Sequence, residues 1–593
     1  MAAAQSLKLI NSKDNKGKKT MEKEWVLPRK LSDEEHQFVA NLAANLKCPY
    51  QIAELLFRKG IRNEEEIKYF FEPSMSKLHD PYLFAEMGKA VERIQKAIDS
   101  HERITIYGDY DVDGTTATAL LYLGLKRIGA DIDFYIPHRM IDGYGLSLNS
   151  LDFLRDNGSS LIISVDCGVN AQEEIEAINA MGMEIIITDH HNPKDKLPPA
   201  YAIINPKLPG CNYPYPDLAG VGVAYKLLCA VYQRVGIDTE ENLMKYMDLV
   251  AVGTIADIVP LTGENRIFAY IGLKHLIDKK NLGLNALIQI SGMNHKSLDA
   301  TDIVFGIAPR INAAGRMGSA ALAVELLIST EEEKSQELAE IIERQNSLRQ
   351  QEDQKTFYEA CGIIEKKYMD INKTSCMIIS SDDWHQGVIG IVASKLVEKY
   401  YRPVIMISFK DGFGSGSGRS VADFDLFSAL KETQSNLHSF GGHKYAVGLT
   451  IYQEYIDRFE NEISRYVADN MKLEQIKPPL LLDYEVELYD IHDYLLDWME
   501  RFAPFGPENS RPVFVTHNVT VANYPYNVGR NHLKIKVQKD GVTLDLIGYN
   551  LGDYLPLLKK NSLIDIAYTL EYNRFGNKVS IQGKLRDIHI IKD

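Results

Sequence analysis

Short apolar runs alternate with amphipathic segments between residues 103 and 189 of this chain. The runs RITIYG, DIDFYIP, LIISVD and EIIITD are rich in isoleucine, and the segments TTATALLYLGLKRIG and AQEEIEAINAMG lie between them. Strands and helices that alternate at this spacing are typical of βαβ units, and strands that are apolar throughout indicate a parallel sheet with both faces covered. We therefore predict an α/β fold whose main domain, residues 101–330, is built on a parallel sheet.

Other regions of the chain have different patterns. Apolar residues at helical intervals predict a helical lead-in over residues 25–100, and residues 243–330 are expected to be largely helical as well. A strongly charged stretch follows, in which Leu338, Ile341, Ile342 and Leu348 keep helical spacing while the middle is nearly all polar. This pattern favours a long exposed helix at residues 331–370 that links two domains.

Two further domains are predicted beyond this helix. Residues 371–470 contain the strand-like runs CMIIS and VIMIS, the helical segment VIGIVASKLVEKY and a glycine-rich turn, GFGSGSGRS. Together they indicate a second α/β domain. Residues 475–593 contain short alternating runs separated by Gly, Asn and Asp, a pattern that predicts an antiparallel OB-like barrel.

The composition restricts the class of protein. The chain has 593 residues, 45% of them hydrophobic and 25% charged, which is the mixture of a globular protein with several domains. Its formal net charge of -15 repels a polyanion at long range. Any binding of nucleic acid would therefore depend on bound cations and on local clusters of Lys and Arg.

Cysteine usage and hydropathy favour a cytoplasmic protein. The six cysteines form no C-x-x-C pair, which argues against a zinc knuckle and a disulfide framework and favours a reducing compartment. No apolar run approaches the roughly 18 residues needed to span a bilayer. Residues 1–24 are rich in lysine, lack the apolar stretch of a signal peptide, and are predicted to be a disordered tail.

Three aspartates follow the first predicted strand, in the segment YGDYDVDG. In an extended backbone Asp109, Asp111 and Asp113 would project to one face, and three carboxylates so close stay ionised in a partly buried site only beside cations. The alternatives are an Asx-rich turn or the N-cap of a helix ahead of TTATALL. An EF-hand loop is excluded, because position 120, where it needs glutamate, is Leu120.

Two later strands also end in residues that bind metals. LIISVD delivers Asp166, and EIIITDHH delivers Asp189, His190 and His191. The carboxyl ends of parallel strands open on one crevice, so we expect these groups to converge with the first three aspartates. Asp257 lies in an otherwise apolar helical stretch, where an unpaired carboxylate is costly to bury. Helix capping or an ion pair is the alternative explanation for Asp257.

The chemistry of this cluster suits two divalent cations. Oxygen ligands with one or two imidazoles favour Mn²⁺ or Mg²⁺ over zinc. The cluster holds more carboxylates than one ion needs, which implies two ions that share a ligand, and such a pair activates water and neutralises charge on a phosphate. Hydrolysis of a phosphoester is therefore the reaction that the residues alone predict.

The segments DYDVDG, SVDCG, TDHHNP and GTIADIVPL resemble the four ordered motifs of the DHH phosphoesterase superfamily. The flanking segments PSMSKLHDPYLFAEMGKAVERI, RINAAGRMGSA, GSGRS and GGHKYAVGLT are similar to the RecJ branch of that superfamily. The resemblance implies a monomeric, single-stranded-DNA-specific 5′ to 3′ exonuclease that releases 5′-mononucleotides in recombination and repair. It also implies two divalent cations, Mn²⁺ or Mg²⁺, and two partners, a single-strand-binding protein and a helicase.

The same resemblance assigns roles to individual residues. The metal ligands would be Asp111, Asp113, Asp166, His190 and Asp257, with Asp166 as the bridge, and Asp109 either as a further ligand or just behind the ligands. Asp189 would orient a histidine, as carboxylates behind metal ligands do. His191 would contact the scissile phosphate or the leaving oxygen, and Arg316 would reach the phosphate.

Contacts with nucleic acid are implied in both later domains. The second domain resembles the DHH-associated domain, whose GGHKYAVG turn would present glycines that allow close approach of a backbone. The implied contacts are Gly441, Gly442, His443, Ser417 and Arg419, with Arg139 and Tyr144 gripping the strand near the metals. In the β domain, Tyr524, Tyr526, Arg530, His532 and Lys534 would stack bases or track phosphates, or serve only the structure of the barrel.

Two other functions are compatible with the sequence. One is a DHH enzyme for small substrates, either a phosphodiesterase of short oligonucleotides or cyclic dinucleotides or a pyrophosphatase, although such relatives are shorter and lack the terminal β domain. The other is a non-catalytic DHH scaffold that binds nucleic acid, against which the intact metal motifs argue.

Overall fold

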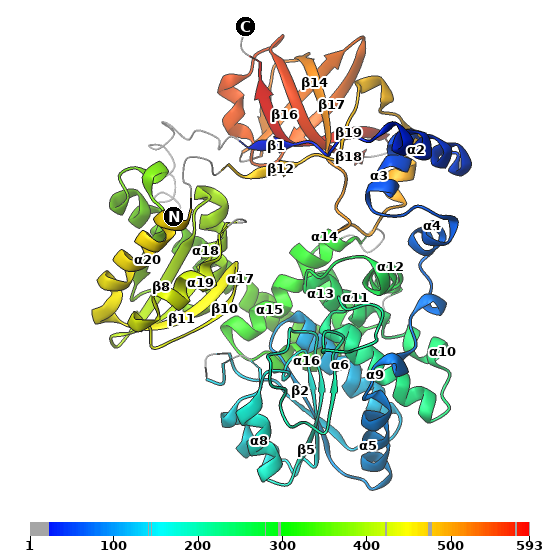
Figure 1. The fold of residues 1–593 in the computed structure, drawn as a ribbon, viewed down its shortest axis with the longest axis vertical. Helices are drawn as coiled ribbons and strands as arrows, with labels where there is room; N and C mark the ends of the chain where they lie inside the picture. Colours follow the sequence, from blue (N-terminus) through cyan, green and yellow to red (C-terminus); the bar gives the residue numbers. More distant parts are fainter. Residues whose placement is uncertain are drawn as a thin grey trace. The chain divides into compact units, whose positions relative to one another are not determined.

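A computed structural model of the chain describes residues 23–139, 141–143, 145–278, 280–293, 298–421, 424–471, 477–529, 531–575 and 578–591 (Figure 1). The chain forms two compact units. One contains residues 72–474 and 504–509, and the other contains residues 1–71, 475–503 and 510–593. The predicted disordered tail, residues 1–24, lies almost wholly outside the described residues, and the domain boundaries drawn from the sequence stay predictions.

A five-stranded parallel sheet forms the base of the larger unit. Its order is β3-β2-β4-β5-β6, with β2 at Ile104–Gly108, β3 at Ile132–Tyr135, β4 at Leu161–Val165, β5 at Glu184–Thr188 and β6 at Ala202–Ile204. The chain runs from β2 to β3 on one side and then returns to β4 on the other side. The crevice at the carboxyl ends of β2 and β4 is therefore the switch point where ligands bind in such sheets.

Helices cover both faces of this sheet, as apolar parallel strands require. The helices are α5 (Met87–Asp99), α6 (Val112–Arg127), α7 (Leu151–Asp156), α8 (Gln172–Ala180) and α9 (Gly220–Arg234). Residues of α5, α6 and α9 pack with Ile104 and Ile106 in one core cluster. Residues of α7 and α8 pack with Ile162 and Ile185 in another. The predicted α/β fold with a parallel sheet is confirmed.

The helical region after the sheet has its own core. Its helices are α10 (Thr239–Met244), α11 (Met247–Ala256), α12 (Gly263–Ile277), α13 (Leu282–Ile290), α14 (Ala300–Asp302), the π-helical turn Ile303–Ile307, α15 (Ala308–Met317) and α16 (Ala321–Leu327). The long helix α17 (Glu332–Lys367) follows as predicted. It is not exposed throughout, because it buries Asn346 and Asp353 in its polar middle, where Asp353 accepts a hydrogen bond of 2.6 Å from Lys395.

The second α/β region lies in the same unit. It contains β7 (Met377–Ser381), α18 (Gln386–Tyr400), β8 (Val404–Lys410), β9 (Phe413–Arg419), α19 (Leu426–Glu432), β10 (Ser439–His443), β11 (Ala446–Tyr452) and α20 (Ile456–Asn470). The sheet order is β10-β11-β9-β8-β7. The glycine-rich segment predicted as a turn is strand β9. Its alternate glycines face the core, where a Cβ on Gly416 would lie 2.8 Å from Leu449.

The smaller unit combines helices with a closed barrel. Its elements are β1 (Glu24–Val26), α2 (Asp33–Leu46), α3 (Tyr50–Arg58), α4 (Glu64–Phe71), β12 (Pro479–Leu481), β13 (Tyr484–Glu485), α21 (Asp493–Glu500), β14 (Phe514–Val521), β15 (Tyr526–Val528), β16 (His532–Lys539), β17 (Val542–Gly548), β18 (Leu563–Phe575) and β19 (Lys578–Ile590). The sheet closes because β14 pairs with both β18 and β16. Most pairs are antiparallel, which confirms the predicted OB-like domain.

No helix in the described part of the chain is both long and apolar enough to cross a bilayer.

Candidate metal centre

The first aspartates lie where β2 turns into α6. Asp111 has extended dihedral angles, but it is the N-cap of α6 and accepts a hydrogen bond of 3.0 Å from the backbone N–H of Gly114. Asp113 lies in the first helical turn, so the backbone is not extended through all three aspartates as predicted. The helix-cap alternative is therefore correct for Asp111. A Cβ on Gly114 would come within 2.6 Å of the Asp109 carbonyl oxygen, so only glycine permits this tight turn.

Asp113 is held by the N-terminus of another helix. Its two carboxylate oxygens accept hydrogen bonds of 2.6 and 2.8 Å from the backbone N–H groups of Gly220 and Val221, at the start of α9. Burial, together with the charge of Asp111, nevertheless raises the pKa of Asp113 to about 7. Two backbone donors thus orient this carboxylate without neutralising the cluster.

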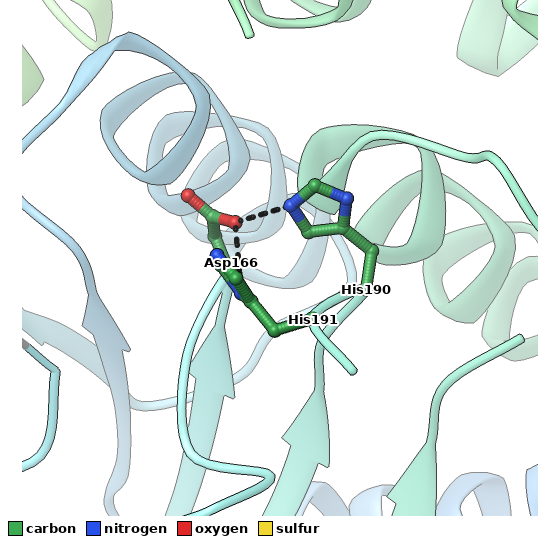
Figure 2. Close-up of side chains that lie close together, drawn as sticks. All are labelled: Asp166, His190 and His191. Carbon is green, nitrogen blue, oxygen red and sulfur yellow. Dashed lines mark ion pairs between the residues drawn. The ribbon is translucent and has the colours of Figure 1, made fainter. Parts of the chain in front are cut away.

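Asp166 faces both histidines of the DHH segment (Figure 2). It follows β4 with a positive φ of 60°, a conformation that costs energy and is often found at functional sites. One of its oxygens, Oδ1, lies 3.1 Å from Nε2 of His190 and 4.0 Å from Nδ1 of His191. His190 Nε2 in turn lies 3.6 Å from Oδ2 of Asp257, which caps the C-terminus of α11.

The possible ligand atoms form three overlapping groups, each with its atoms within 4.8 Å of one another. The groups are Asp109, Asp111 and Asp166; Asp113, His190 and Asp257; and Asp166, His190 and His191. Asp166 and His190 each belong to two of them. This overlap fits two cations bridged by Asp166, which stays a prediction for this chain.

Several of these polar atoms are buried and have no hydrogen-bond partner within the described residues. They are both carboxylate oxygens of Asp109, Oδ1 of Asp166, both ring nitrogens of His190 and Oδ2 of Asp257. Buried polar atoms are nearly always paired, so such atoms in one place require an explanation. Cations at this place would satisfy the carboxylate oxygens and Nε2 of His190, the ring nitrogen that faces Asp166 and Asp257, and the unpartnered oxygens support Asp109 as a ligand in its own right.

The electrostatics of the cluster also require positive charge. Burial, and next the charges of neighbouring aspartates, raise the pKa of Asp109 and Asp166 well above the ordinary range and that of Asp257 to about 9. Burial, followed by the charge of His191, lowers the pKa of His190 to about 3, which keeps this imidazole neutral, as a metal ligand must be. The donor set fits Mn²⁺ or Mg²⁺.

We expect Mn²⁺ to raise the melting temperature of the protein and excess chelator to lower it. A ligand that binds only the folded state stabilises it by about 2.7 kcal/mol at 100 times its dissociation constant. Differential scanning fluorimetry measures the shift. The Asp166→Asn protein, with a disrupted cluster, should lose most of the shift, and an equal shift in both proteins would contradict the assignment.

Asp189 and His191 form a fixed pair beside the cluster. Asp189 Oδ1 accepts hydrogen bonds from Nδ1 of His191 at 2.8 Å and from the backbone N–H groups of His190 and His191. Oδ2 accepts one of 2.9 Å from the backbone N–H of Val169. Burial is the largest single influence and opposes ionisation of both groups. Their mutual hydrogen bond and attraction, together with the backbone donors to Asp189 and the charges of Asp109 and Asp111 near His191, outweigh it, so the pKa of Asp189 is lowered and that of His191 is raised. The pair suits a proton donor held in one orientation.

Arginines from separate segments gather next to the metal-binding loop. Arg316, in the last turn of α15, donates to the carbonyl of Gly387 at 3.0 Å, and Arg139 lies over the ring of Tyr110, 4.8 Å from its centroid. Arg419 of β9 donates to Ser417 Oγ at 3.0 Å. The structure thus brings together four residues that the resemblance had marked.

These guanidinium groups repel one another. Burial, and then the charges of Arg139, Arg349 and Arg419, lower the pKa of Arg316 to about 10. Arg349 of α17 was missed in the sequence because it lies in a run of charges that is typical of a solvated helix face. Crowded cations of this kind form a binding site for an anion such as phosphate.

The remaining predicted contacts differ in how far the structure describes them. Gly441, Gly442 and His443 lie on strand β10 rather than in a turn, and Gly442 has a φ of 129°, which favours glycine. His443 lines the same cavity as Asp189 and His191. Tyr144 lies outside the described residues.

Comparisons with known proteins match all three regions. The DHH family, N-terminal domain, matches residues 103–254, the DHHA1 domain matches residues 373–469, and the RecJ OB domain matches residues 482–587. The single-stranded-DNA-specific exonuclease RecJ of Escherichia coli (strain K12) is 32% identical over 582 residues, which cover 95% of this chain and 98% of that protein. The chain belongs to the RecJ family.

Other members of the RecJ family are also similar to this chain over most of its length. The single-stranded-DNA-specific exonuclease RecJ of Bacillus subtilis (strain 168) is 35% identical over 566 residues, or 95% of this chain and 70% of that protein. A crystal structure of RecJ in complex with Mn²⁺ from Thermus thermophilus has a TM-score of 0.81 and 26% identity, and the match covers 96% of this chain and 80% of that one.

Proposed function

We propose that this chain is a divalent-metal-dependent exonuclease that hydrolyses single-stranded DNA from the 5′ end and releases 5′-mononucleotides in recombination and repair. The main support for this proposal is a cluster of buried carboxylate and imidazole atoms at the switch point of the sheet. These atoms have no hydrogen-bond partners in the described part of the chain. Membership of the RecJ family supports the substrate and the repair role.

The residues around the cluster perform different tasks. Asp109, Asp111, Asp113, Asp166, His190 and Asp257 would hold the cations. Two divalent cations bound there supply activation of water and neutralise charge on the scissile phosphate. Asp189 accepts a hydrogen bond from Nδ1 of His191. The other ring nitrogen, Nε2, is therefore the atom that would donate a proton to the leaving 3′ oxygen. Against burial, the hydrogen bond and the charge of Asp189 raise the pKa of His191, which favours the protonated ring that a proton donor needs.

The arginine cluster provides an anchor for the 5′-terminal phosphate. Arg139, Arg316 and Arg419 with Ser417 offer several N–H and O–H donors, and arginine binds phosphate with two parallel hydrogen bonds. The loop of Asp109 and Asp111 is adjacent, since a Cβ on Gly315 would lie 2.9 Å from the carbonyl oxygen of Tyr110. An anchored terminal phosphate beside the cations supports cleavage from the 5′ end.

Arg316→Ala is expected to reduce kcat/KM on 5′-phosphorylated single-stranded DNA by about 100-fold, because it removes a buried charged donor. The same variant should no longer distinguish 5′-phosphate from 5′-hydroxyl ends. Arg344→Ala, which removes an exposed arginine of α17, is the matched control. If Arg316→Ala still prefers 5′-phosphate over 5′-hydroxyl ends, the terminal phosphate binds elsewhere.

The barrel of the smaller unit supplies a further surface for the strand. Tyr524 and Tyr526 are 77% and 48% exposed, Tyr526 pairs across strands with Lys534, and His532 starts β16. Exposed aromatic rings next to lysine suit base stacking and phosphate contact. Arg530 lies outside the described residues.

A nuclease assay with Mn²⁺ tests the whole proposal. It compares 5′-labelled single-stranded DNA, duplex DNA, RNA and cyclic dinucleotides, with Asp166→Asn as the inactive control. Mononucleotides released from single-stranded DNA alone are expected. Intact DNA together with turnover of dinucleotides would favour the small-substrate phosphodiesterase, and no turnover at all would favour the scaffold.

We also propose that the protein acts in the cytoplasm as a monomer, beside a single-strand-binding protein and a helicase. The six cysteines are all free thiols, which suits a reducing compartment. Size-exclusion chromatography with light scattering tests the monomer, and pull-down with purified partners tests the association.

A further inference from the structure

A short loop from late in the chain is part of the unit that contains the metal centre. Residues 504–509 belong to the larger unit, although the residues on either side of them in the chain belong to the smaller one. The loop is a tight turn, in which Gly506 and Asn509 exchange two backbone hydrogen bonds of 3.1 and 3.0 Å. A proline and then Glu508, with a φ of 55°, form its centre, which is the pattern of a type II turn. The buried side chain of Asn509 closes the loop by donating to the carbonyl of Pro504 at 2.9 Å.

This loop contacts the segment that joins α11 to α12. The backbone N–H of Leu261 donates to the carbonyl of Pro507 at 2.9 Å. Arg266, in α12, donates from its guanidinium group to the carbonyl of Pro504 at 3.4 Å. A Cβ on Gly506 would lie 2.5 Å from Cδ1 of Leu261, so glycine lets the loop lie directly against this side chain. The loop therefore holds both the segment and the helix that follows it.

The segment begins at a predicted metal ligand, Asp257, the C-cap of α11. The next residue, Ile258, has a φ of 62°, which is strained for a β-branched residue and persists only where the surrounding structure imposes it. Its side chain is 64% exposed, so packing of Ile258 itself does not impose this conformation. Leu261, in contrast, is buried in the core cluster that also contains Val112 of α6. The strained turn after Asp257 thus depends on contacts made further along the segment.

The carboxylate of Asp257 depends on this backbone for its position. Its Oδ2 is buried, has no hydrogen-bond partner among the described residues and lies 3.6 Å from Nε2 of His190. No hydrogen bond from the described residues therefore directs this oxygen toward the cluster. The backbone after Asp257 is held at the carbonyl of Pro260, which accepts from Tyr215 and Asn265, and one residue later by the loop.

We propose that residues 504–509 position Asp257 for metal binding. The inference rests on the metal centre of the proposed function and adds a positioning role for a loop that supplies no ligand of its own. Asp257 belongs to one ligand group, with Asp113 and His190, and not to the group that contains Asp109. Displacing the loop should therefore weaken one cation site and spare the other.

Two loop variants, Gly506→Ala and Asn509→Ala, test the proposal. The backbone of Gly506 does not have a positive φ, so alanine there disturbs the contact with Leu261 and not the backbone conformation. Asn509→Ala loosens the loop from inside, because it removes the donor to the carbonyl of Pro504. Gly362→Ala, in α17, is the matched control, since it adds the same methyl group where the surrounding space is open.

Hydrogen exchange reports on the loop in the metal-free protein. Residues 258–262 should exchange faster in both loop variants than in wild type, because the N–H of Leu261 loses its acceptor at Pro507. The Gly362→Ala protein should exchange at the wild-type rate in this segment. Unchanged exchange in both loop variants overturns the bracing contact.

Titration with Mn²⁺ reports on the metal centre. The electron paramagnetic resonance signal of free Mn²⁺ counts the bound ions, and the wild-type and Gly362→Ala proteins should bind two. In both loop variants one site should weaken about tenfold, as when a group that orients a metal ligand is removed. Gly506→Ala should not further weaken the site that remains in Asp257→Asn. An equal loss at both sites, or no loss in either loop variant, overturns the proposal.

Metal binding and hydrolysis are measured separately, so the two proposals can fail independently. Selective weakening of one Mn²⁺ site in a protein that leaves single-stranded DNA intact sustains the role of the loop and overturns the exonuclease. Hydrolysis of DNA with unchanged Mn²⁺ binding in both loop variants overturns the role of the loop alone. A wild-type protein that binds no Mn²⁺ overturns both.

Discussion

Substitution of Asp166 by asparagine is expected to reduce hydrolysis of single-stranded DNA by more than about 1,000-fold. Asp166 belongs to two of the three ligand groups and its Oδ1 is buried without a partner in the described part of the chain. Cations stabilise phosphoryl transfer by several kcal/mol, and each 1.36 kcal/mol is a factor of about ten in rate. Release of labelled nucleotide under single-turnover conditions with Mn²⁺ measures the loss.

The choice of asparagine separates a loss of catalysis from a loss of folding. Asparagine has the size of aspartate and tolerates the φ of 60° that Asp166 adopts, whereas alanine does not. Asp195→Asn, at an exposed position after the DHH segment, should stay within about twofold of wild type, as surface changes usually do. Activity near wild type in Asp166→Asn would remove Asp166 from the metal centre.

Lys226→Met is expected to lower the free energy of unfolding of the larger unit by about 3–5 kcal/mol. Lys226 of α9 and Glu264 of α12 are 1% and 0% exposed and form an ion pair of 2.6 Å. Glu264 also accepts hydrogen bonds from the backbone N–H of His79 and from the hydroxyl of Tyr213. Removing the lysine leaves a buried carboxylate without its cation. Urea denaturation followed by fluorescence measures the loss.

The double variant Lys226→Met/Glu264→Gln should recover much of that stability, because neutral groups replace both charges. If Lys226→Met is as stable as the wild-type protein, the ion pair of Lys226 and Glu264 is not buried in solution. Since α9 also supplies the two backbone donors to Asp113, weaker Mn²⁺ binding should accompany the loss of stability in the single variant.

The main ligands of the metal site can be predicted from the local sequence pattern. Apolar runs that end in Asp109, Asp166 and Asp189 predict parallel strands, and the carboxyl ends of parallel strands meet at one edge. The structure brings Asp109 and Asp166 together with His190 and Asp257, and Asp189 holds His191 beside them. The prediction of an extended backbone through Asp109, Asp111 and Asp113 was wrong, because Asp111 caps α6 and starts the helix earlier.

Glycine-rich segments were harder to interpret. GFGSGSGRS reads as a turn, because glycine is enriched in turns. In the structure it is a strand whose glycines make room for Ile407, Leu449 and Val447 on neighbouring strands. The long helix α17 likewise buries Asn346 and Asp353, although its polar sequence favours an exposed helix. In both cases other elements of the fold contribute deciding contacts, such as Leu449 of β11 for Gly416 and Lys395 of α18 for Asp353.

By itself the sequence determined the types of ligand, the order of strands and helices, and the α/β class, because periodicity and strand-end chemistry are local. Only the tertiary structure decided which carboxylates have hydrogen-bond partners. Asp113 is held by Gly220 and Val221, about a hundred residues away, while Asp109 is buried beside Asp111 and Asp166 with both oxygens unpartnered among the described residues. Pairing of this kind depends on how distant helices pack, which no local pattern encodes.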